Sequence, residues 1–407
     1  MPFTAEQIAK IRQKEAELPT SQRRNPLNSY AEGWFHVTLN VRGEAPVLGY
    51  VVGILDADEG SLDAPRCVLT DLGKAVEEAW KRNPVIYQGV ENVEFQIMPE
   101  HVHCLLHLCP ENKKHLGQII KGFMIGCSHG YWDTLGIPWR EMTYEKGVRT
   151  PQYNDPDHTR SYRGPALFVR GYNDVEAVTP EEIEIKRQYI RNNPRKRLIT
   201  RSKPDRFRIE RNKHSTNWTL SRAFSAIAAD SYIGRNPQKC RALQEKISQR
   251  LKQDAATGRL CIDFLGNHAL LSAQRKVSLI CHRTDAQLFE LQKAAVLQAA
   301  REGAVVVSAF ISPKERDVMK QLMLEQLPFI ELMDNGFSER YKPFGKAFYS
   351  VAENRHVQLS CWTYEYRMQN KDSEGKENGS SSISREMCLV MNELVRIITG
   401  KEDDWWK

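Results

Sequence analysis

Several features are missing from the 407-residue sequence. No apolar run approaches the roughly 20 residues that a membrane-spanning helix needs, which excludes a membrane-embedded protein. The nine cysteines form no C-x-x-C pair, so reduced and mostly buried thiols are favoured over a disulfide framework or a cysteine zinc site. The first residues lack the basic-then-apolar order of a signal peptide. We therefore expect a cytoplasmic protein that does not associate with membranes.

The composition is that of a soluble globular protein, with 41% hydrophobic, 27% charged and 9% aromatic residues. A chain of this length predicts two domains. The net charge of +7 fits a nucleic-acid partner but does not require one. The charge is concentrated, because residues 186–213 contain twelve Lys or Arg against two Asp or Glu, a sum of +10. The rest of the chain therefore sums to 7 − 10 = −3.

Hydrophobic periodicity predicts an α+β fold for the first half, an antiparallel sheet with helices on it. The expected strands are 34–41 with 47–54 as its hairpin partner, then 90–98 and 101–108. The expected helices are 70–80, 115–131 and 179–193, the last with a threonine cap, proline in its first turn and Pro194 as its stop. Residues 132–165 hold little periodicity and several Pro, Gly and Asp residues, so they are expected to be an irregular loop.

The second half predicts an α/β domain. Short β-branched strands at 277–280, 304–308, 328–332 and 357–360 are separated by helical segments, which is typical of a parallel sheet. The predicted organisation is an N-terminal arm 1–28, a first domain 29–213 that includes the basic tail, a helical linker 214–259, an α/β domain 260–366, and a mobile loop with a terminal helix 367–407.

Two histidines form the first candidate site. His101 and His103 point to the same face of their predicted strand, because strand side chains repeat every two residues, so they can share one metal ion. Cys104 points the other way, and His107 lies about 13 Å further along. Taken alone, the pair is better explained as two ordinary histidines on a half-exposed strand.

A tyrosine and an asparagine form the second candidate site. Tyr189 and Asn193 lie one turn apart on the predicted helix. If that face covers the histidine strand, Asn193 completes a mixed imidazole and amide-oxygen site, which suits Mn²⁺ or Mg²⁺. A phosphate whose charge is neutralised by the ion can then be attacked by the Tyr189 phenol, with nearby arginines favouring the phenolate, to give a covalent phosphotyrosine. The alternative is an ordinary packed tyrosine.

The residues MPEHVH at 98–103 and YIRNNP at 189–194 carry a family resemblance. The first half of the chain resembles the single-tyrosine HUH transposases, and within them the REP-associated tyrosine transposases. The resemblance implies an HUH endonuclease-like fold, DNA transposition and recombination on single-stranded or hairpin DNA, and a homodimer. Residue by residue, it implies Tyr189 as nucleophile and His101, His103 and Asn193 as ligands of a divalent metal.

The start of the basic segment is the candidate DNA contact. Functionally it is a track for phosphates beside the site, and the alternative is a solvated basic linker. The candidate DNA-binding residues are Lys186, Arg187, Arg191, Arg195, Lys196 and Arg197.

Residues 260–362 resemble, more weakly, the Rossmann-like fold of DNA-processing A proteins and nucleotide-sensing domains. No G-x-G follows the predicted strands, so a pyrophosphate-binding turn is poorly supported, although Ser308, Ser312 and Arg283 lie at strand ends where a phosphate could bind. Two functions remain open from the sequence. One is a metal-dependent single-stranded DNA transposase, and the other is a non-catalytic DNA-binding regulator with a ligand-sensing C-terminal domain.

Overall fold

The structure is a computed structural model that describes residues 30–140, 165–281, 286–339, 341–366 and 383–407. The predicted arm 1–28, most of the predicted loop 132–165, Arg283 and the predicted mobile segment before the terminal helix lie outside the described residues. The first residues of that predicted loop, 132–134, are instead the end of a helix. The chain forms two compact units, and the first ends at Ile199.

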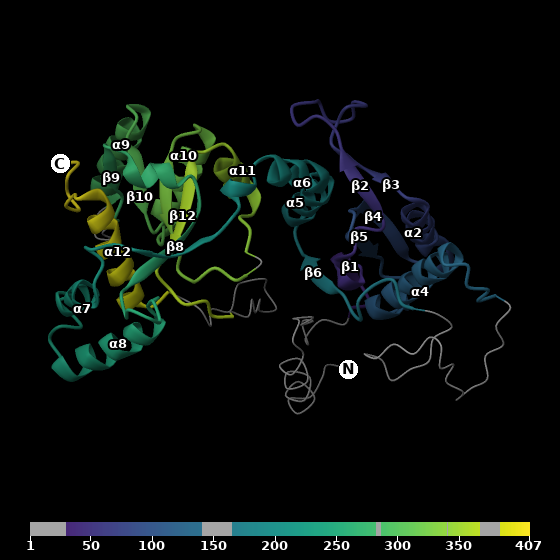
Figure 1. The fold of residues 1–407 in the computed structure, drawn as a ribbon, viewed down its shortest axis with the longest axis horizontal. Coiled ribbons are helices and arrows are strands. Elements are labelled where there is room, and N and C mark those ends of the chain that lie inside the picture. The colour runs from purple at the N-terminus through teal and green to yellow at the C-terminus, as the bar shows by residue number, and fades with distance from the viewer. Residues whose placement is uncertain (1–29, 141–164, 282–285, 340, 367–382) are drawn as a thin grey trace. The chain divides into compact units, whose positions relative to one another are not determined.

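The first unit is built on a four-stranded antiparallel sheet with the order β4-β5-β1-β6 (Figure 1). The strands of this sheet are β1 (Gly33–Asn40), β4 (Val90–Ile97), β5 (His101–Leu108) and β6 (Asn173–Ala177). A separate sheet pairs β2 (Gly49–Val52) with β3 (Arg66–Leu69). The helices are α2 (Asp71–Lys81), α3 (Asn83–Ile86), α4 (Leu116–Thr134), α5 (Pro180–Arg191) and α6 (Asn193–Ser202), with a 3-10 turn at Arg42–Glu44. The predicted antiparallel sheet with helices is confirmed.

Alternation along β5 determines what each face of the sheet meets. Val102, Cys104 and Leu106 are fully buried in the core that α2 and α4 cover. His101 and His103 therefore point to the opposite face, where α5 lies (Figure 1). The same alternation on β1 buries Phe35 and turns the neighbouring polar side chains toward α5.

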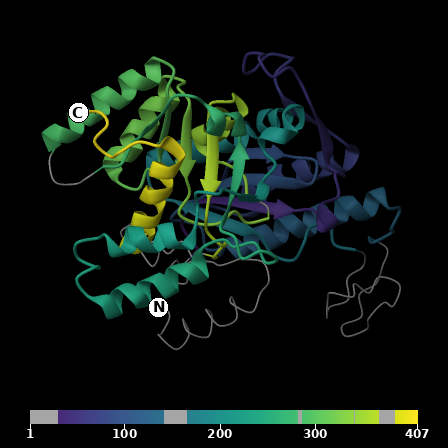
Figure 2. The ribbon, with the colours of Figure 1, turned by 60° about the vertical axis from the view of Figure 1, so that its left-hand side comes forward.

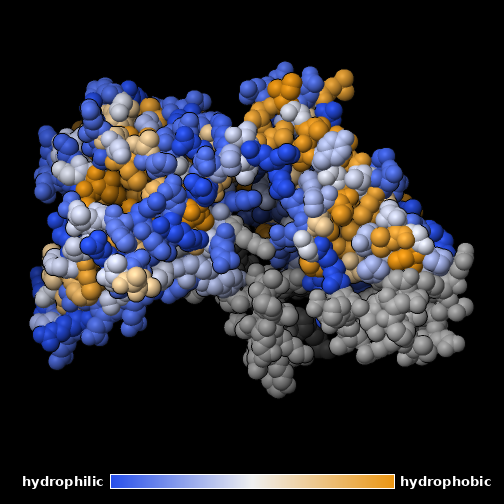
Figure 3. Space-filling model, in the orientation of Figure 1, coloured by the Kyte–Doolittle hydropathy of each residue, from blue (hydrophilic) through white to orange (hydrophobic). Residues whose placement is uncertain are grey.

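The predicted hairpin between residues 34–41 and 47–54 is wrong. Both edges of β1 are occupied by strands from later in the chain, β5 and β6. β2 instead forms a hairpin with β3, whose tip exposes apolar side chains such as Leu62, 89% exposed (Figure 3). The short connection between β1 and β2 favours pairing of these two neighbours in the sequence. β5 is more apolar than β2, however, and so matches the buried face of β1 better.

The helix that carries Tyr189 begins as predicted but ends differently. Thr179 accepts a hydrogen bond from the Glu182 N–H, the expected N-cap. α5 ends at Arg191, and Pro194 lies in the first turn of a second helix, α6, instead of stopping the first. A proline fits this position because the first turn leaves its N–H groups without intrahelical partners.

The second unit contains a six-stranded sheet with the order β7-β8-β12-β11-β10-β9 (Figures 1 and 2). Its strands are β7 (Glu210–His214), β8 (Cys261–Gly266), β9 (Lys276–Ser278), β10 (Val305–Ser308), β11 (Phe329–Leu332) and β12 (His356–Ser360). Its helices are α7 (Leu220–Ala228), α8 (Pro237–Arg250), α9 (Ala286–Arg301), α10 (Pro313–Leu324), α11 (Gly345–Ala352) and α12 (Arg385–Thr399), with 3-10 turns at Pro204–Arg206 and His268–Ser272. β9 to β12 are parallel, as predicted, and β7 and β8 are antiparallel.

Two segments assigned elsewhere from the sequence lie in this unit. The end of the predicted basic tail forms β7, where Arg211 pairs with the buried carboxylate of Asp263. The predicted linker forms α7 and α8, whose Ile227 and Ile247 are buried in one core with α12. Apolar burial therefore makes these helices part of the domain, and α12 itself packs against β9 and β10 (Figure 2). Among the described helices, none combines the length and apolar character needed to cross a membrane.

Candidate active site

His101 and His103 present converging nitrogens on the α5 face of the sheet. Their Nε2 atoms lie 3.1 Å apart. An ion about 2.1 Å from each nitrogen would subtend an angle of about 95° at this separation, close to the right angle of octahedral coordination. The separation of the two nitrogens is therefore compatible with a shared divalent ion.

Two β1 side chains contact His103 at Nδ1, the ring nitrogen that does not face His101. Its Nδ1 lies 3.1 Å from Thr38 Oγ1 and 3.2 Å from His36 Nε2, and Thr38 is its direct register partner on β1. A proton on Nδ1 can be donated to these acceptors, which leaves the lone pair on Nε2 facing His101. Hydrogen bonds of this kind fix the ring and tautomer of metal-binding histidines.

Burial keeps the inner histidines neutral. It lowers the pKa of His36 to about 4, with a smaller contribution from the positive charge of Lys186. It also lowers the pKa of His103 well below its usual value, and the repulsion that a charged His103 would meet from His101, His36 and Lys196 lowers it further. A neutral imidazole has the free lone pair that a metal ion requires.

The outer histidine contacts a carboxylate. His101 Nδ1 lies 3.5 Å from Glu100 Oε1, and Arg197 of α6 donates to both oxygens of Glu100 at 2.9 and 3.3 Å. Hydrogen bonding to His101 lowers the pKa of Glu100, and the charge of Arg197 lowers it further. Glu100 therefore orients one candidate ligand and also ties α6 to the start of β5.

Tyr189 lies over the histidines. Its ring meets His103 edge-on, with centroids 5.4 Å apart and planes at 82°, and it meets His36 at 5.6 Å. Burial raises the pKa of the phenol, although 36% of the residue remains exposed. The cation that the structure places on this ring is a lysine and not one of the expected arginines: the Lys196 ammonium lies 4.5 Å from the ring centroid.

Asn193 lies next to this group, but its amide nitrogen is bound to its own helix. Nδ2 donates to the carbonyls of Tyr189 at 2.8 Å and Ile190 at 3.3 Å. These bonds bridge the junction of α5 and α6. Oδ1 is then the atom of this side chain that could reach an ion. The structure thus joins His101 to His103 and His103 to Tyr189, whereas the hydrogen bonds of Asn193 are to the backbone of the Tyr189 helix.

The predicted DNA-binding arginines already have partners within the first unit, those of α5 on β4 and those of α6 on the β2–β3 hairpin and Glu100. Arg191 lies 2.8 Å and Arg187 3.5 Å from Glu94 Oε2 of β4. Arg195 of α6 donates to backbone carbonyls of the β2–β3 hairpin, and Arg197 binds Glu100. The two lysines among the six act on the histidines, because the charge of Lys186 lowers the pKa of His36 and the charge of Lys196 lowers that of His103.

His36 and Thr38 were not predicted as site residues. The available signal was the alternation of β1, which places both on the face opposite the buried Phe35. Their role depends on the register between β1 and β5, which hydrophobic alternation alone does not determine.

The strand ends of the second unit are occupied by the chain itself. Ser308 Oγ accepts from the Phe310 N–H, and Ser312 Oγ accepts from the Glu315 N–H. The buried Glu315 carboxylate accepts from the N–H groups of Ser312 and Cys281, both at 2.8 Å. A carboxylate thus occupies the N-terminus of α10, the position at which a phosphate would bind.

The solved structures that the chain is similar to include two transposases. No family model and no curated protein match the sequence. A REP-associated tyrosine transposase bound to a REP hairpin is 14% identical, with a TM-score of 0.26 over 44% of this chain and 74% of that one. A candidate transposase from Deinococcus radiodurans is 17% identical, with a TM-score of 0.21 over 42% of this chain and 96% of that one. At these scores the likeness carries no argument about fold or function, so a functional assignment has to rest on the residues of the site.

Proposed function

We propose that the protein cleaves and rejoins single-stranded DNA through Tyr189, assisted by a divalent Mn²⁺ or Mg²⁺ ion at His101, His103 and Asn193. One observation carries the proposal: the Nε2 atoms of His101 and His103 converge at 3.1 Å, and the His103 ring meets the ring of Tyr189. A tyrosine that only packed its ring would need neither the two converging histidine nitrogens nor the contacts of Thr38 with His103 and of Glu100 with His101.

The residues have separate tasks. Nε2 of His101 and of His103, with Oδ1 of Asn193, would hold the ion. When bound, the ion supplies positive charge that polarises a phosphate and lowers the barrier to attack on it. The Lys196 ammonium over the phenol ring stabilises the negative charge that develops on the tyrosine oxygen.

The proposed step balances as a transesterification. A bond forms between Tyr189 Oη and phosphorus while the bond from phosphorus to the departing strand's oxygen breaks. The phenol proton passes to that oxygen, directly or through water. The products are a phosphotyrosine ester and a free hydroxyl, and the reverse reaction with another hydroxyl reseals a strand without ATP.

The wider assignment belongs to the same proposal. The site, and the motifs that resemble REP-associated tyrosine transposases, support hairpin or single-stranded DNA as substrate and a homodimer as the active form. We assign DNA chemistry to the first unit, and we propose a Rossmann-like relationship for the second from its four parallel strands and crossover helices.

The test is covalent capture of labelled single-stranded hairpin DNA in the presence of Mn²⁺. The wild-type protein should give an adduct that survives denaturation, and a chelator should abolish it. Tyr189→Phe should give no adduct while DNA binding persists. The matched control is Tyr50→Phe, which changes an exposed tyrosine on β2 of the same unit and should leave the adduct unchanged.

Two outcomes would replace the proposal. Cleavage by Tyr189→Phe would exclude this residue as nucleophile. Equal DNA binding with and without Mn²⁺, with no adduct in the wild-type protein, would favour the non-catalytic regulator.

A further inference from the structure

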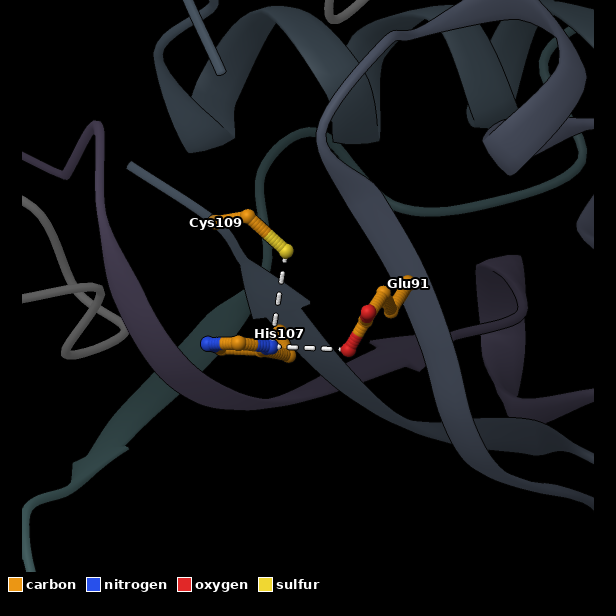
Figure 4. A group of neighbouring side chains, drawn as sticks. All are labelled: Glu91, His107 and Cys109. Carbon is orange, nitrogen blue, oxygen red and sulfur yellow. Dashed lines mark hydrogen bonds and ion pairs between the residues drawn. The ribbon is translucent and has the colours of Figure 1, made fainter. Parts of the chain in front are cut away.

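A second group of metal-binding side chains lies at the other end of β5 (Figure 4). His107 Nδ1 lies 2.8 Å from Glu91 Oε2 and 3.6 Å from Cys109 Sγ, and the three ligand atoms all lie within 4.8 Å of one another. Figure 4 shows the carboxylate and the thiol approaching the same edge of the imidazole. His107 is four residues from His103, about 13 Å along the strand, so the two groups cannot share an ion.

The sheet itself positions this group. Glu91 and His107 are direct register partners on β4 and β5, and a register shift follows at Asn92 and Glu94. Such irregularities re-aim side chains at sheet edges. On the other side, Trp34 stacks on the His107 ring, with centroids 4.2 Å apart and planes at 14°. The ring therefore has one fixed plane, with Nδ1 toward its two partners.

The cysteine is fixed by a tight turn. The Cys109 N–H donates to the Gly89 carbonyl at 2.8 Å. Gly89 has φ +74°, and a Cβ there would lie 2.7 Å from the Asn112 nitrogen, so a side chain is excluded. Cys109 is only 8% exposed, whereas Glu91 is exposed and free to adjust. The group thus combines two rigid ligands with one adaptable ligand.

The distances match tetrahedral zinc. With bonds of about 2.1 Å to nitrogen, 2.3 Å to sulfur and 2.0 Å to oxygen, tetrahedral angles place nitrogen and sulfur about 3.6 Å apart and nitrogen and oxygen about 3.3 Å apart. The first separation is already present, and the second requires Glu91 to move back by about half an ångström.

The donor set differs from that of the candidate active site. The cysteine adjacent to His103 in the sequence, Cys104, is fully buried on the opposite face of β5, so that face of the strand offers the His101/His103 pair no thiol from this residue. Soft sulfur ligands select zinc over magnesium or manganese. Burial and the negative charges of Glu91 and Glu111 raise the pKa of the Cys109 thiol, and a bound cation would offset that repulsion.

We propose that Glu91, His107 and Cys109 bind one Zn²⁺ ion, with the fourth position open to water. The ion would link β4 to the end of β5 and so stabilise the sheet edge from which the chain continues to α4. This zinc site is independent of the proposed DNA chemistry, because it shares no residue with it.

The test uses metal-free full-length protein titrated with Co²⁺, a spectroscopic substitute for Zn²⁺. Wild-type protein should develop a near-ultraviolet thiolate-to-cobalt charge-transfer band, which Zn²⁺ displaces, and one equivalent of Zn²⁺ should raise the melting temperature. Cys109→Ser should lose the band, whereas Cys67→Ser, a partly buried thiol on β3 of the same unit, should keep it. His101→Ala should also keep it, since imidazole ligation alone gives no such band.

Glu91→Gln provides a test that does not disturb the core, because this side chain is 60% exposed. It should weaken Zn²⁺ binding about tenfold or more while the metal-free melting temperature stays the same. The proposal is overturned if the wild-type protein shows neither the band nor the stabilisation, or if the band survives in Cys109→Ser.

Discussion

The two units place polar groups at the ends of their strands in opposite ways. In the first, His101 and His103 turn two lone pairs toward one point and are supported from behind by Thr38 and Glu100. In the second, the Glu315 carboxylate closes the turn before α10 by accepting two backbone N–H groups. The first unit therefore has histidine nitrogens that are suited to binding a metal ion. In the second unit, the backbone N–H groups that could bind a phosphate are already hydrogen-bonded to Glu315.

This contrast indicates where function can be sought in a two-domain chain. Strand ends of a parallel sheet are the usual ligand sites of α/β folds. Here the serines at those ends cap the backbone, and a buried acid occupies the helix N-terminus. The antiparallel unit, whose site lies on a sheet face under a helix, contains the groups suited to phosphate chemistry.

His103→Ala should have the strongest effect of the substitutions considered. Loss of a ligand removes several kcal/mol of transition-state stabilisation, so DNA cleavage should fall about 10³-fold. The cleavage rate is measured under single-turnover conditions at saturating Mn²⁺. His268→Ala, at an exposed histidine of the second unit, should leave the rate unchanged. If the cleavage rate of His103→Ala falls by less than tenfold, the convergence of His101 and His103 is not what makes the site active.

Glu315→Ala tests the second unit. Removing a buried carboxylate that accepts two backbone N–H groups should lower the free energy of unfolding by about 3 kcal/mol. Urea unfolding gives this value, and Glu325→Ala, at an exposed ion pair with Arg301, should cost far less. Phosphate or sulfate should partly restore the stability of Glu315→Ala, since an anion can take the vacated position. An unchanged stability would show that this carboxylate does not close the turn.

Thr38→Val tests the support behind His103. The substitution keeps the shape of the side chain and removes the hydroxyl oxygen next to Nδ1, so Mn²⁺ affinity should fall about 10- to 100-fold. Isothermal titration measures the affinity, and Thr38→Ser should restore most of it. Equal affinities for all three proteins would mean that His103 needs no orienting hydroxyl.

Nucleotides should have the weakest effect on the wild-type protein. Mono- and dinucleotides without added metal should not raise the melting temperature, because Ser308 and Ser312 are already hydrogen-bonded to the backbone. Differential scanning fluorimetry is sufficient. If a nucleotide clearly raised the melting temperature, the strand ends of the second unit would have to be open to a ligand, and the second unit would be a ligand sensor.

Much of the fold could be predicted from local patterns. Alternation predicted β4 and β5, the Thr179 cap predicted the start of α5, and β-branched runs predicted the parallel strands. The hairpin partner of β1 could not be predicted, because pairing depends on which strand buries the better matching face. Pro194 was misleading, because proline suits the first turn of a helix as well as the residue after one.

The candidate site was predictable only in part. His101 and His103 share a face by their spacing, and Tyr189 joins them if α5 covers that face. His36 and Thr38 required the register of β1 against β5. The ion pairs of Arg187 and Arg191 with Glu94 required the packing of α5 on β4, so a basic run in the sequence could not reveal that its arginines are already paired.

The most direct measurement is the identity of the residue that becomes attached to DNA. Wild-type protein is incubated with hairpin DNA and Mn²⁺, digested, and the nucleotide-modified peptide is sequenced by mass spectrometry. We predict a single modified peptide, with the phosphodiester on Tyr189. Modification of any other residue, or cleavage with complete release of phosphate-ended products and no modified peptide, would contradict this role for Tyr189.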